Sequence, residues 1–280
     1  MSKIIVITGP TGVGKTDLSI KLAKEIDAEI INADSMQVYQ GMDVGTNKVT
    51  KSEMDGVVHH LLDIKTVDED YSVAEYQRDG RDLIKDILGR DKMVIIVGGT
   101  GLYINALLYD YKFEDEQDTE VVTKEEMIQF LEENEIEVDK SNLRRIERAY
   151  TRFINDNVTK NGDKLLFDAI FFGVTTKRDD LYNRINSRVD EMIEEGLIEE
   201  VKALYNKYPK ARSLNTAIGY KEVISYLNDE IDLNECKELI KKNTRNYAKR
   251  QYTWFNNKMD LTWLDKDEAL NIIDIIKKHR

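Results

Sequence analysis

The sequence is poor in the residues from which disulfides and metal frameworks are built. It contains one cysteine, Cys236, and three histidines among 280 residues. One cysteine forms no intramolecular disulfide, which is typical of a reducing compartment, and a cysteine/histidine metal centre lacks its ligands. For the adjacent pair His59 and His60, no acid or cysteine completes a ligand set, so we do not expect a metal there.

Proline and long apolar runs are equally scarce. Two prolines in the whole chain, without repeats or low-complexity tracts, predict order almost throughout. No segment approaches the roughly twenty apolar residues that cross a bilayer, and the apolar run after Lys3 is too short for a signal peptide. We therefore predict a cytoplasmic protein without a membrane partner, and we expect a monomer.

Basic residues are outnumbered overall but are concentrated in two places. The formal net charge of −12 by itself predicts repulsion from nucleic acid. In residues 241–255, however, basic side chains recur every three or four positions among aromatic ones, a pattern that suits RNA recognition. Each cluster is equally compatible with a solvated helix face that pairs with the many acids of this chain. The first cluster contains Lys242, Arg245, Lys249, Arg250, Tyr247, Tyr252 and Trp254, and the second contains Arg144, Arg145, Arg148 and Arg152.

Short apolar segments alternate with helical patterns along the chain. Continuous apolar strands predict a parallel sheet covered by helices on both faces, with ligands bound beyond the carboxyl ends of the strands. The predicted fold class is α/β, with a P-loop NTPase-like parallel sheet of about five strands. The expected strands are residues 3–9, 28–34, 93–99, 167–174 and 260–265.

Two helical segments lie outside this minimal core. Residues 111–164 are polar, first acidic and then basic, and predict a small helical insertion domain. Residues 179–230 carry long amphipathic patterns and predict a helical lid or bundle. The predicted core therefore comprises residues 1–110 and 165–280, including the C-terminal helices.

The clearest motif is a phosphate-binding loop, "GPTGVGKT", between the first expected strand and a helix. Its glycines let backbone N–H groups converge on phosphate oxygens at a helix N-terminus. Lys15 adds a positive charge, and the hydroxyl of Thr16 is a predicted ligand of Mg²⁺. The predicted phosphate-binding residues are Gly9, Pro10, Thr11, Gly12, Val13, Gly14, Lys15 and Thr16.

The acid that usually accompanies such a loop is missing. In ATPases and GTPases a later strand ends in an acid that helps to hold Mg²⁺, but the strand at 93–97 is followed by Gly98, Gly99 and Thr100. The nearest candidate is Asp34, after the second strand, which could also be a helix cap or a turn residue. The Thr100 hydroxyl is free to bind a substrate, or it belongs to an ordinary strand-to-helix turn.

Several motifs together resemble the bacterial tRNA dimethylallyltransferase (tRNA isopentenyltransferase) family. They are "GPTGVGKT", "NADSMQVYQGMDVGT", "HHLLDI" with "YSVAEY", "VGGTGLY", "AIGYKE" and "TRNYAKRQYTWF", and they follow one another over nearly the whole chain. Val49 stands where the family usually has proline, and the approach to the arginines of the insert is short. This departure concerns the RNA contacts of the insert and leaves the core chemistry alone.

The resemblance implies transfer of a dimethylallyl group from its diphosphate to N6 of the adenosine immediately 3′ of the anticodon, in tRNAs that read codons starting with U. It implies that Gly9 to Thr16 bind the diphosphate with Mg²⁺ as cofactor. The catalytic residues would be Asp34, acting as base, Lys15 and Thr100. The tRNA anticodon stem-loop would contact the insert and the residues Asp34, Ser35, Met36, Gln37, Thr100, Arg144, Arg145, Arg148, Arg245, Lys249 and Arg250.

Elementary chemistry agrees with this assignment. The exocyclic nitrogen of adenine is a poor nucleophile, so a carboxylate that accepts its proton helps as charge builds. The loop would hold a leaving group, and no γ-phosphate would need positioning, which explains the missing metal-binding acid.

Two other function classes share the same loop. A P-loop kinase for a nucleoside or small metabolite would need arginines that clamp ATP, and Arg178, Arg184 and Arg188 are available. A regulatory nucleotide-binding module without chemistry would leave Asp34 and Thr100 without a role.

Overall fold

The structure, a computed structural model, describes residues 4–113, 122–134, 136, 138–140, 143, 146–147, 149–150, 162, 164–265 and 272. The chain divides into two compact units. The first unit comprises residues 1–107 and 167–280, and the second comprises residues 108–166, which include the segment predicted as an insert.

A parallel sheet of six strands forms the centre of the first unit, in the order β3-β2-β4-β1-β5-β6. Five of these strands were predicted. The sixth, β3, pairs its two histidines with Ile30 and Ile31 at the edge of the sheet. Two residues are too few to show a hydrophobic period, so the sequence pattern did not reveal this strand. The strands are β1 (Ile4–Thr8), β2 (Ala28–Asn32), β3 (His59–His60), β4 (Met93–Val97), β5 (Ala169–Thr175) and β6 (Thr262–Asp265).

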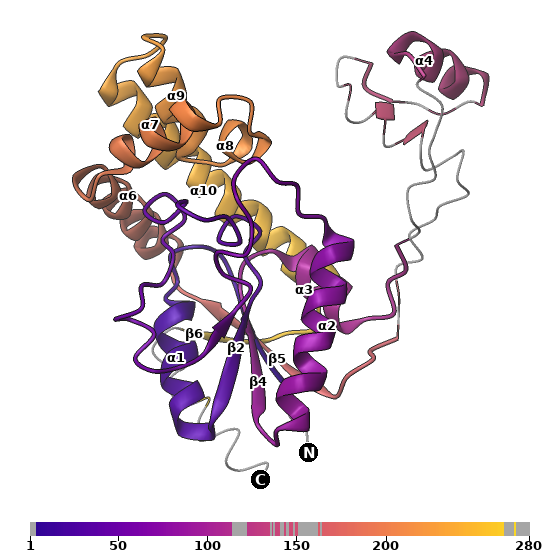
Figure 1. Ribbon diagram of the computed structural model, residues 1–280, viewed down its shortest axis with the longest axis vertical. Helices are drawn as coiled ribbons and strands as arrows, with labels where there is room; N and C mark the ends of the chain where they lie inside the picture. Colours follow the sequence, from indigo (N-terminus) through magenta and orange to yellow (C-terminus); the bar gives the residue numbers. More distant parts are fainter. Residues whose placement is uncertain are drawn as a thin grey trace. The chain divides into compact units, whose positions relative to one another are not determined.

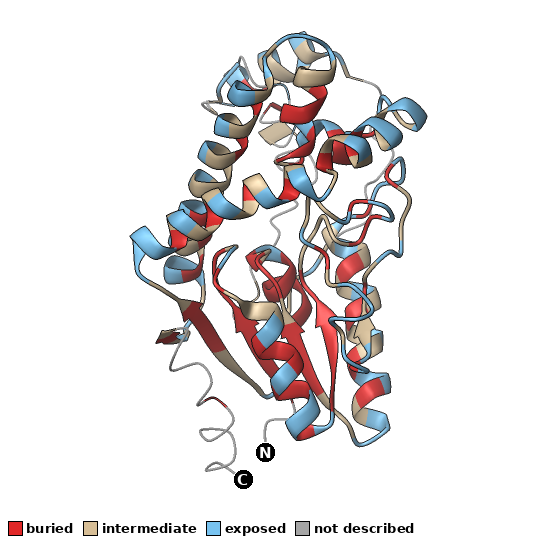
Figure 2. Cartoon of the chain, turned by 90° about the vertical axis from the view of Figure 1, so that its left-hand side faces the viewer, coloured by how far each residue is buried: buried red, intermediate tan, exposed pale blue. Residues whose placement is uncertain are grey.

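Helices cover both faces of the sheet, as the continuous apolar strands predicted. Helix α1 (Lys15–Ile26) lies on one side, and α2 (Val73–Gly89) with α3 (Gly101–Leu108) lies on the other (Figure 1). Every residue of β1 and β2 is buried, whereas α1 and α2 alternate buried and exposed positions (Figure 2). Apolar burial on both faces of the sheet is the main stabilisation of this unit.

The remaining helices of the first unit gather beyond the carboxyl ends of the strands (Figure 1). They correspond to the predicted helical lid and to the basic C-terminal segment. The long helix α10 (Leu233–Lys258) packs against α6 and α9 and runs back toward the sheet. The others are α6 (Arg178–Glu194), α7 (Leu197–Lys207), α8 (Arg212–Thr216) and α9 (Tyr220–Leu227).

The second unit contains the helix α4 (Lys124–Glu133), which begins with a capping box formed by Thr123 and Glu126. Leu131 and Ile146 are fully buried in this unit. The predicted RNA-contacting residues Arg144, Arg145, Arg148 and Arg152 lie outside the described residues.

A buried carboxylate, Glu29, ties the edge of the sheet together. Its side chain is 4% exposed and accepts hydrogen bonds from Arg90 at 2.5 and 2.8 Å, and it lies 2.8 Å from Nε2 of His60. These hydrogen bonds, with that of Arg90 the strongest influence, hold the pKa of Glu29 at about 2 although burial opposes the shift. His60 is therefore a hydrogen-bond partner of Glu29. Among the residues that the structure describes, no group of three or more His, Cys, Asp or Glu side chains is arranged to hold a metal ion.

No helix in the described ranges has both the length and the apolar composition that a bilayer crossing requires.

Replacing Glu29 with Gln should lower the free energy of unfolding by about 2 kcal/mol at pH 7, because Arg90 loses its buried partner. Since the pKa of Glu29 is depressed in the folded protein from 4.5 to about 2, its contribution is complete above pH 4.5 and disappears as the pH falls toward 2. Urea unfolding at pH 7 and at lower pH should therefore give a difference from wild type that shrinks with acid. The exposed Glu194→Gln on α6 is the control and should match wild type at each pH. A Glu29→Gln deficit that stayed constant below pH 4 would contradict the charge assignment.

Candidate active site at the carboxyl ends of the strands

The loop between β1 and α1 has the geometry of a phosphate cradle. Gly9 (φ 135°), Gly12 (φ 84°) and Gly14 (φ 88°) adopt conformations that favour glycine. An added Cβ at Gly9 would lie 2.3 Å from the carbonyl oxygen of Val174 on β5, so no larger residue fits. The loop leads directly into the first turn of α1, where free backbone N–H groups and the helix dipole favour an anion.

Lys15 folds back over this loop. Its Nζ donates hydrogen bonds to the carbonyl oxygens of Gly9 (2.9 Å) and Pro10 (2.7 Å). Burial lowers the pKa of Lys15 to about 8, and the nearby charge of Asp34 partly opposes this shift. The ammonium group of Lys15 therefore lies against Gly9 and Pro10, the first residues of the cradle, where a bound anion would stabilise its positive charge.

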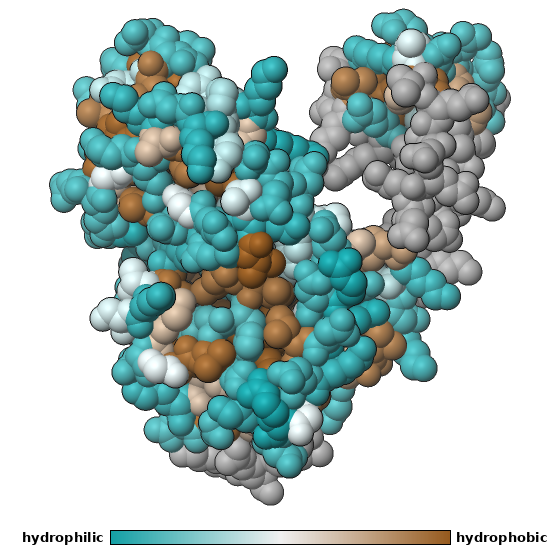
Figure 3. Space-filling model, in the orientation of Figure 1, coloured by the Kyte–Doolittle hydropathy of each residue, from teal (hydrophilic) through white to brown (hydrophobic). Residues whose placement is uncertain are grey.

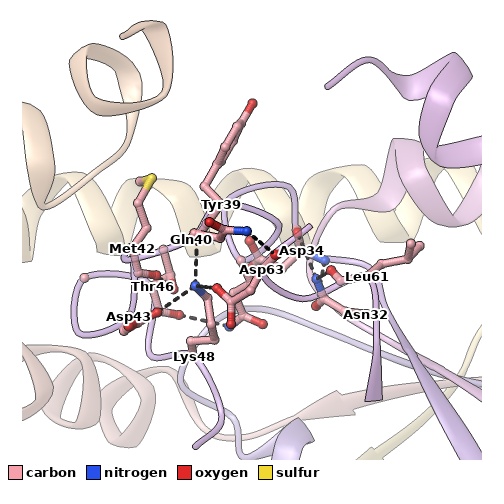
Figure 4. Close-up of polar contacts among 12 residues, drawn as sticks. Asn32, Asp34, Tyr39, Gln40, Met42, Asp43, Thr46, Lys48, Leu61 and Asp63 are labelled. Carbon is pink, nitrogen blue, oxygen red and sulfur yellow. Dashed lines mark hydrogen bonds and ion pairs between the residues drawn. The ribbon is translucent and has the colours of Figure 1, made fainter. Parts of the chain in front are cut away.

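Asp34 lies just beyond the carboxyl end of β2, and both its side chain and its backbone form hydrogen bonds. One carboxylate oxygen accepts the backbone N–H of Met36 at 2.9 Å. Asn32 accepts the backbone N–H of Asp34 at 3.1 Å and donates to its carbonyl oxygen at 3.1 Å and to that of Leu61 at 3.1 Å (Figure 4). Burial raises the pKa of Asp34, while the Met36 N–H and the charge of Lys15 pull it down. This carboxyl group is thus a better proton acceptor than an exposed aspartate.

Thr100 lies beside this turn because β4 is the neighbour of β2. The backbone N–H of Ser35 donates to its hydroxyl at 3.1 Å, and the Thr100 N–H donates to Ala33 at 3.0 Å. A Cβ on Gly98 would lie 2.2 Å from the backbone of Ala33, so only glycine permits this approach. The structure therefore brings Asp34, Ser35 and Thr100 together.

The segment after Asp34 is held by a buried lysine that sequence reasoning missed. The side chain of Lys48 is 4% exposed, and its Nζ donates to the carbonyl oxygen of Tyr39 at 2.7 Å and to the carboxylates of Asp43 (2.7 Å) and Asp63 (2.6 Å) (Figure 4). Burial of a lysine requires such partners. Only the resemblance to the motif at residues 32–46 pointed to this region, and no local pattern singled out Lys48.

Met36 and Gln37 follow in the same segment. The Gln37 amide donates to the carbonyl oxygen of Thr46 at 3.0 Å, which closes the loop. Both side chains are partly exposed, so they remain accessible to a ligand.

A second anchor, Glu200 on α7, fixes the far end of this segment. Its carboxylate accepts the backbone N–H groups of Asp43 (3.0 Å), Val44 (2.8 Å) and Gly45 (3.1 Å), and the hydroxyl of Tyr220 at 2.5 Å. A Cβ on Gly45 would lie 2.3 Å from the Tyr220 ring, which explains the glycine. Helix α7 thus holds the loop that follows Asp34 in place through hydrogen bonds to its backbone.

Helix α10 supplies two further residues to which sequence reasoning gave no role in the site. Gln251 is 5% exposed, accepts the Thr11 N–H at 2.9 Å and donates to the Gly99 carbonyl at 2.9 Å. Tyr247, one turn earlier, interacts through its side chain with Thr100 and Gln251. Both belong to the motif "TRNYAKRQYTWF"; Tyr247 was also noted as an aromatic residue of the basic cluster, whereas only the motif pointed to Gln251.

The predicted basic stripe on α10 is only partly exposed. Lys249 and Arg250 are exposed, and the Arg250 guanidinium lies 5.7 Å from the ring centroid of Tyr247. Arg245 instead hydrogen-bonds Asn186 on α6, and Tyr252 stacks on Trp263 of β6 at 5.5 Å. Arg245 and Tyr252 therefore have partners within the protein, which helical spacing could not show because it identifies a common face but not what packs against it.

The lid arginine Arg188, considered as an ATP clamp, has acidic partners of its own. Its guanidinium lies 2.9 Å from the carboxylate of Glu195, the C-cap of α6, and 3.5 Å from that of Glu191 in the same helix. Arg178 lies with its guanidinium 5.1 Å from the Tyr182 ring centroid. These contacts do not favour an arginine clamp over a bound triphosphate.

The parallel sheet, the glycine cradle and the lysine folded over it define a P-loop protein of the α/β class. A model of the family described as IPP transferase matches residues 37–258. A tRNA dimethylallyltransferase of Bacillus anthracis is 44% identical over 296 residues, which cover 98% of this chain and 94% of the relative. The chain belongs to the IPP transferase family.

Solved structures agree over the full length. The chain resembles a tRNA isopentenylpyrophosphate transferase of Staphylococcus epidermidis, with 38% identity, a TM-score of 0.77 and coverage of 99% of this chain and 97% of that one. The corresponding enzyme of Bacillus halodurans gives 39% identity, a TM-score of 0.79 and coverage of 99% and 96%. A eukaryotic dimethylallyltransferase acting on tRNA gives 28% identity, a TM-score of 0.82 and coverage of 100% of this chain and 80% of that one.

Replacing Glu200 with Ala should lower the free energy of unfolding by about 2 kcal/mol, because three backbone N–H groups and a phenol lose their acceptor. Hydrogen exchange at residues 43–45 should accelerate more than exchange in the strands of the sheet. Glu199→Ala removes an exposed carboxylate from the same helix and should change neither measurement. Unchanged exchange at 43–45 in the Glu200 variant would contradict the anchoring role.

Proposed function

We propose that the protein transfers a dimethylallyl group from dimethylallyl diphosphate to N6 of the adenosine immediately 3′ of the anticodon, in tRNAs that read codons starting with U. The observation that carries the proposal is the pairing of a phosphate cradle with a half-buried carboxyl group, Asp34, in the turn beside Thr100. The names of the relatives support the reaction class, and the geometry of the site supports the roles that we propose for its residues.

The cradle stabilises the leaving group. As the bond between the allylic carbon and oxygen breaks, negative charge develops on the departing diphosphate. Backbone N–H groups at the start of α1 would stabilise that charge, and so would the ammonium group of Lys15, which lies over the same loop. Binding of the anion favours the protonated form of Lys15, whose pKa is lowered by burial in the free protein.

Asp34 serves as the base. The N6 nitrogen forms a bond to the allylic carbon, and its proton passes to the Asp34 carboxylate as positive charge grows on the nitrogen. Burial raises the proton affinity of this group. The hydroxyl of Thr100 accepts the Ser35 N–H at 3.1 Å and donates a long hydrogen bond of 3.4 Å to the Ser35 hydroxyl, which an incoming base can replace.

Magnesium fits the site as a companion of the diphosphate. In the described part of the chain no cluster of acids or histidines could bind the ion alone. Mg²⁺ commonly keeps several waters and takes one or two protein ligands together with substrate phosphates, and the hydroxyl of Thr16 at the start of α1 is a suitable ligand. The ion would neutralise charge on the leaving diphosphate.

The RNA contacts are assigned to exposed groups around the site. Lys249 and Arg250 present two positive charges on α10, next to Trp254. Met36 and Gln37 offer partly exposed side chains in the turn after Asp34. The target base must leave the stack of the anticodon loop to reach Asp34, at a cost of a few kcal/mol.

The direct test is incubation with Mg²⁺, labelled dimethylallyl diphosphate and unmodified tRNA. Label in the RNA supports the proposal. Turnover of ATP on a small acceptor, without label in RNA, would favour a kinase instead.

Asp34→Asn should reduce turnover on the order of a hundredfold or more, because the amide accepts no proton, while diphosphate affinity changes little. Single-turnover rates and equilibrium binding of the diphosphate measure the two effects separately. Asp17→Asn makes the same chemical change at an exposed position in the first turn of α1 and should retain activity. Full turnover in Asp34→Asn would remove the base assignment.

Replacing both Lys249 and Arg250 with Ala should weaken tRNA binding and reduce the slope of log K against log salt by roughly 1.5, since two phosphate contacts are lost. Lys21→Ala with Lys85→Ala removes the same charge from the exposed surfaces of α1 and α2 and should leave the slope unchanged. A wild-type slope in the α10 variant would favour a merely solvated helix face.

A further inference from the structure

Gln251 occupies an unusual place, since it joins the phosphate cradle to the turn that carries Thr100. Its side chain is 5% exposed, and its two polar atoms are both used. Oε1 accepts the backbone N–H of Thr11 at 2.9 Å, and Nε2 donates to the carbonyl oxygen of Gly99 at 2.9 Å. Two loops separated by almost ninety residues are thus held by one amide from a third segment.

The orientation of this amide is determined by its partners. A rotation that exchanged Oε1 and Nε2 would set a donor against the Thr11 N–H and an acceptor against the Gly99 carbonyl. Tyr247, one helical turn earlier, also interacts with the Gln251 side chain. A Cβ at Gly99 would lie 2.2 Å from Nε2, so only glycine at position 99 lets the amide approach this closely. The oxygen of Gln251 must therefore face the cradle loop.

The contact takes one backbone N–H group out of the cradle. The peptide unit between Pro10 and Thr11 is held at both ends, because Lys15 donates to the Pro10 carbonyl at 2.7 Å and the Thr11 N–H donates to Gln251. In loops that bind triphosphates, the lysine of the motif reaches the β- and γ-phosphates. The Pro10–Thr11 peptide, which Lys15 contacts, therefore lies at the side of the cradle where the third phosphate of a triphosphate would bind.

We propose that Gln251 is a specificity-determining residue that restricts the cradle to a diphosphate. A third phosphate would find the Thr11 N–H already engaged and would face the lone pairs of the carboxamide oxygen. A diphosphate needs only the remaining N–H groups toward the start of α1 and Lys15. This inference rests on the proposed function, and it explains how a P-loop protein can select a prenyl diphosphate in the presence of nucleoside triphosphates.

The test compares inorganic pyrophosphate with inorganic tripolyphosphate as ligands of the full-length protein at fixed Mg²⁺, by isothermal titration calorimetry. Gln251→Ala frees the Thr11 N–H for the third phosphate, so the ratio of the tripolyphosphate Kd to the pyrophosphate Kd should fall about tenfold relative to wild type. Gln251→Glu keeps an acceptor on Thr11 and adds negative charge, which repels a longer polyphosphate more strongly, so its ratio should exceed that of wild type. The control Gln77→Ala removes an amide that donates to the carbonyl oxygen of Ala106, away from the cradle, and should leave the ratio unchanged.

The outcomes separate this inference from the proposed function. A wild-type ratio in Gln251→Ala, or a ratio in Gln251→Glu that does not exceed that of wild type, would overturn the specificity role while leaving the transferase assignment intact. If one variant does not fold, the other still decides the question, because the two expectations have opposite sign. Failure of wild type to bind pyrophosphate at all would overturn the diphosphate cradle and with it the proposed function.

Discussion

The neighbouring positions of β2, β4 and β1 in the parallel sheet are the constraint on which the site depends. Because parallel strands end at the same edge, the turns after these strands meet there. The turn after β1 forms the cradle, the turn after β2 carries Asp34, and the turn after β4 carries Thr100. Contact between the turns is close enough that a Cβ at Gly98 would lie 2.2 Å from the Ala33 backbone. The glycines are thus a packing requirement of the site as well as a means of binding phosphate.

The helices beyond the sheet hold these turns in place. Glu200 reaches the loop at residues 43–45 across 156 positions of sequence, and Gln251 reaches Thr11 across 240. Each side chain satisfies backbone groups that are mostly partly buried, which makes both contacts costly to lose. The same helix that contributes Gln251 exposes Lys249 and Arg250. A single rigid element therefore connects the cradle with the surface proposed to contact RNA.

The site also keeps two opposite charges in a poorly solvated environment. Burial lowers the pKa of Lys15 and raises that of Asp34, and each charge moderates the shift of the other. Such an arrangement is unfavourable in the empty protein but suits the reaction proposed for it, because a diphosphate stabilises the lysine and a proton from the base neutralises the aspartate. Lys48, with its two carboxylate partners, supports the Asp34 segment without entering the reaction.

The sequence by itself determined the phosphate loop, the α/β class with most of its strands, and the positions of Asp34 and Thr100. These features depend on residues that are close in the chain or on the general rule that parallel strands end together. The edge strand β3, with only two residues, carries no period that a pattern could reveal. The roles of Lys48, Glu200 and Gln251, and the packing of Arg245 and Tyr252 against α6 and β6, were decided by the tertiary structure alone. Each of them depends on partners far away in the sequence, and local spacing carries no information about which distant backbone group a buried polar side chain will meet.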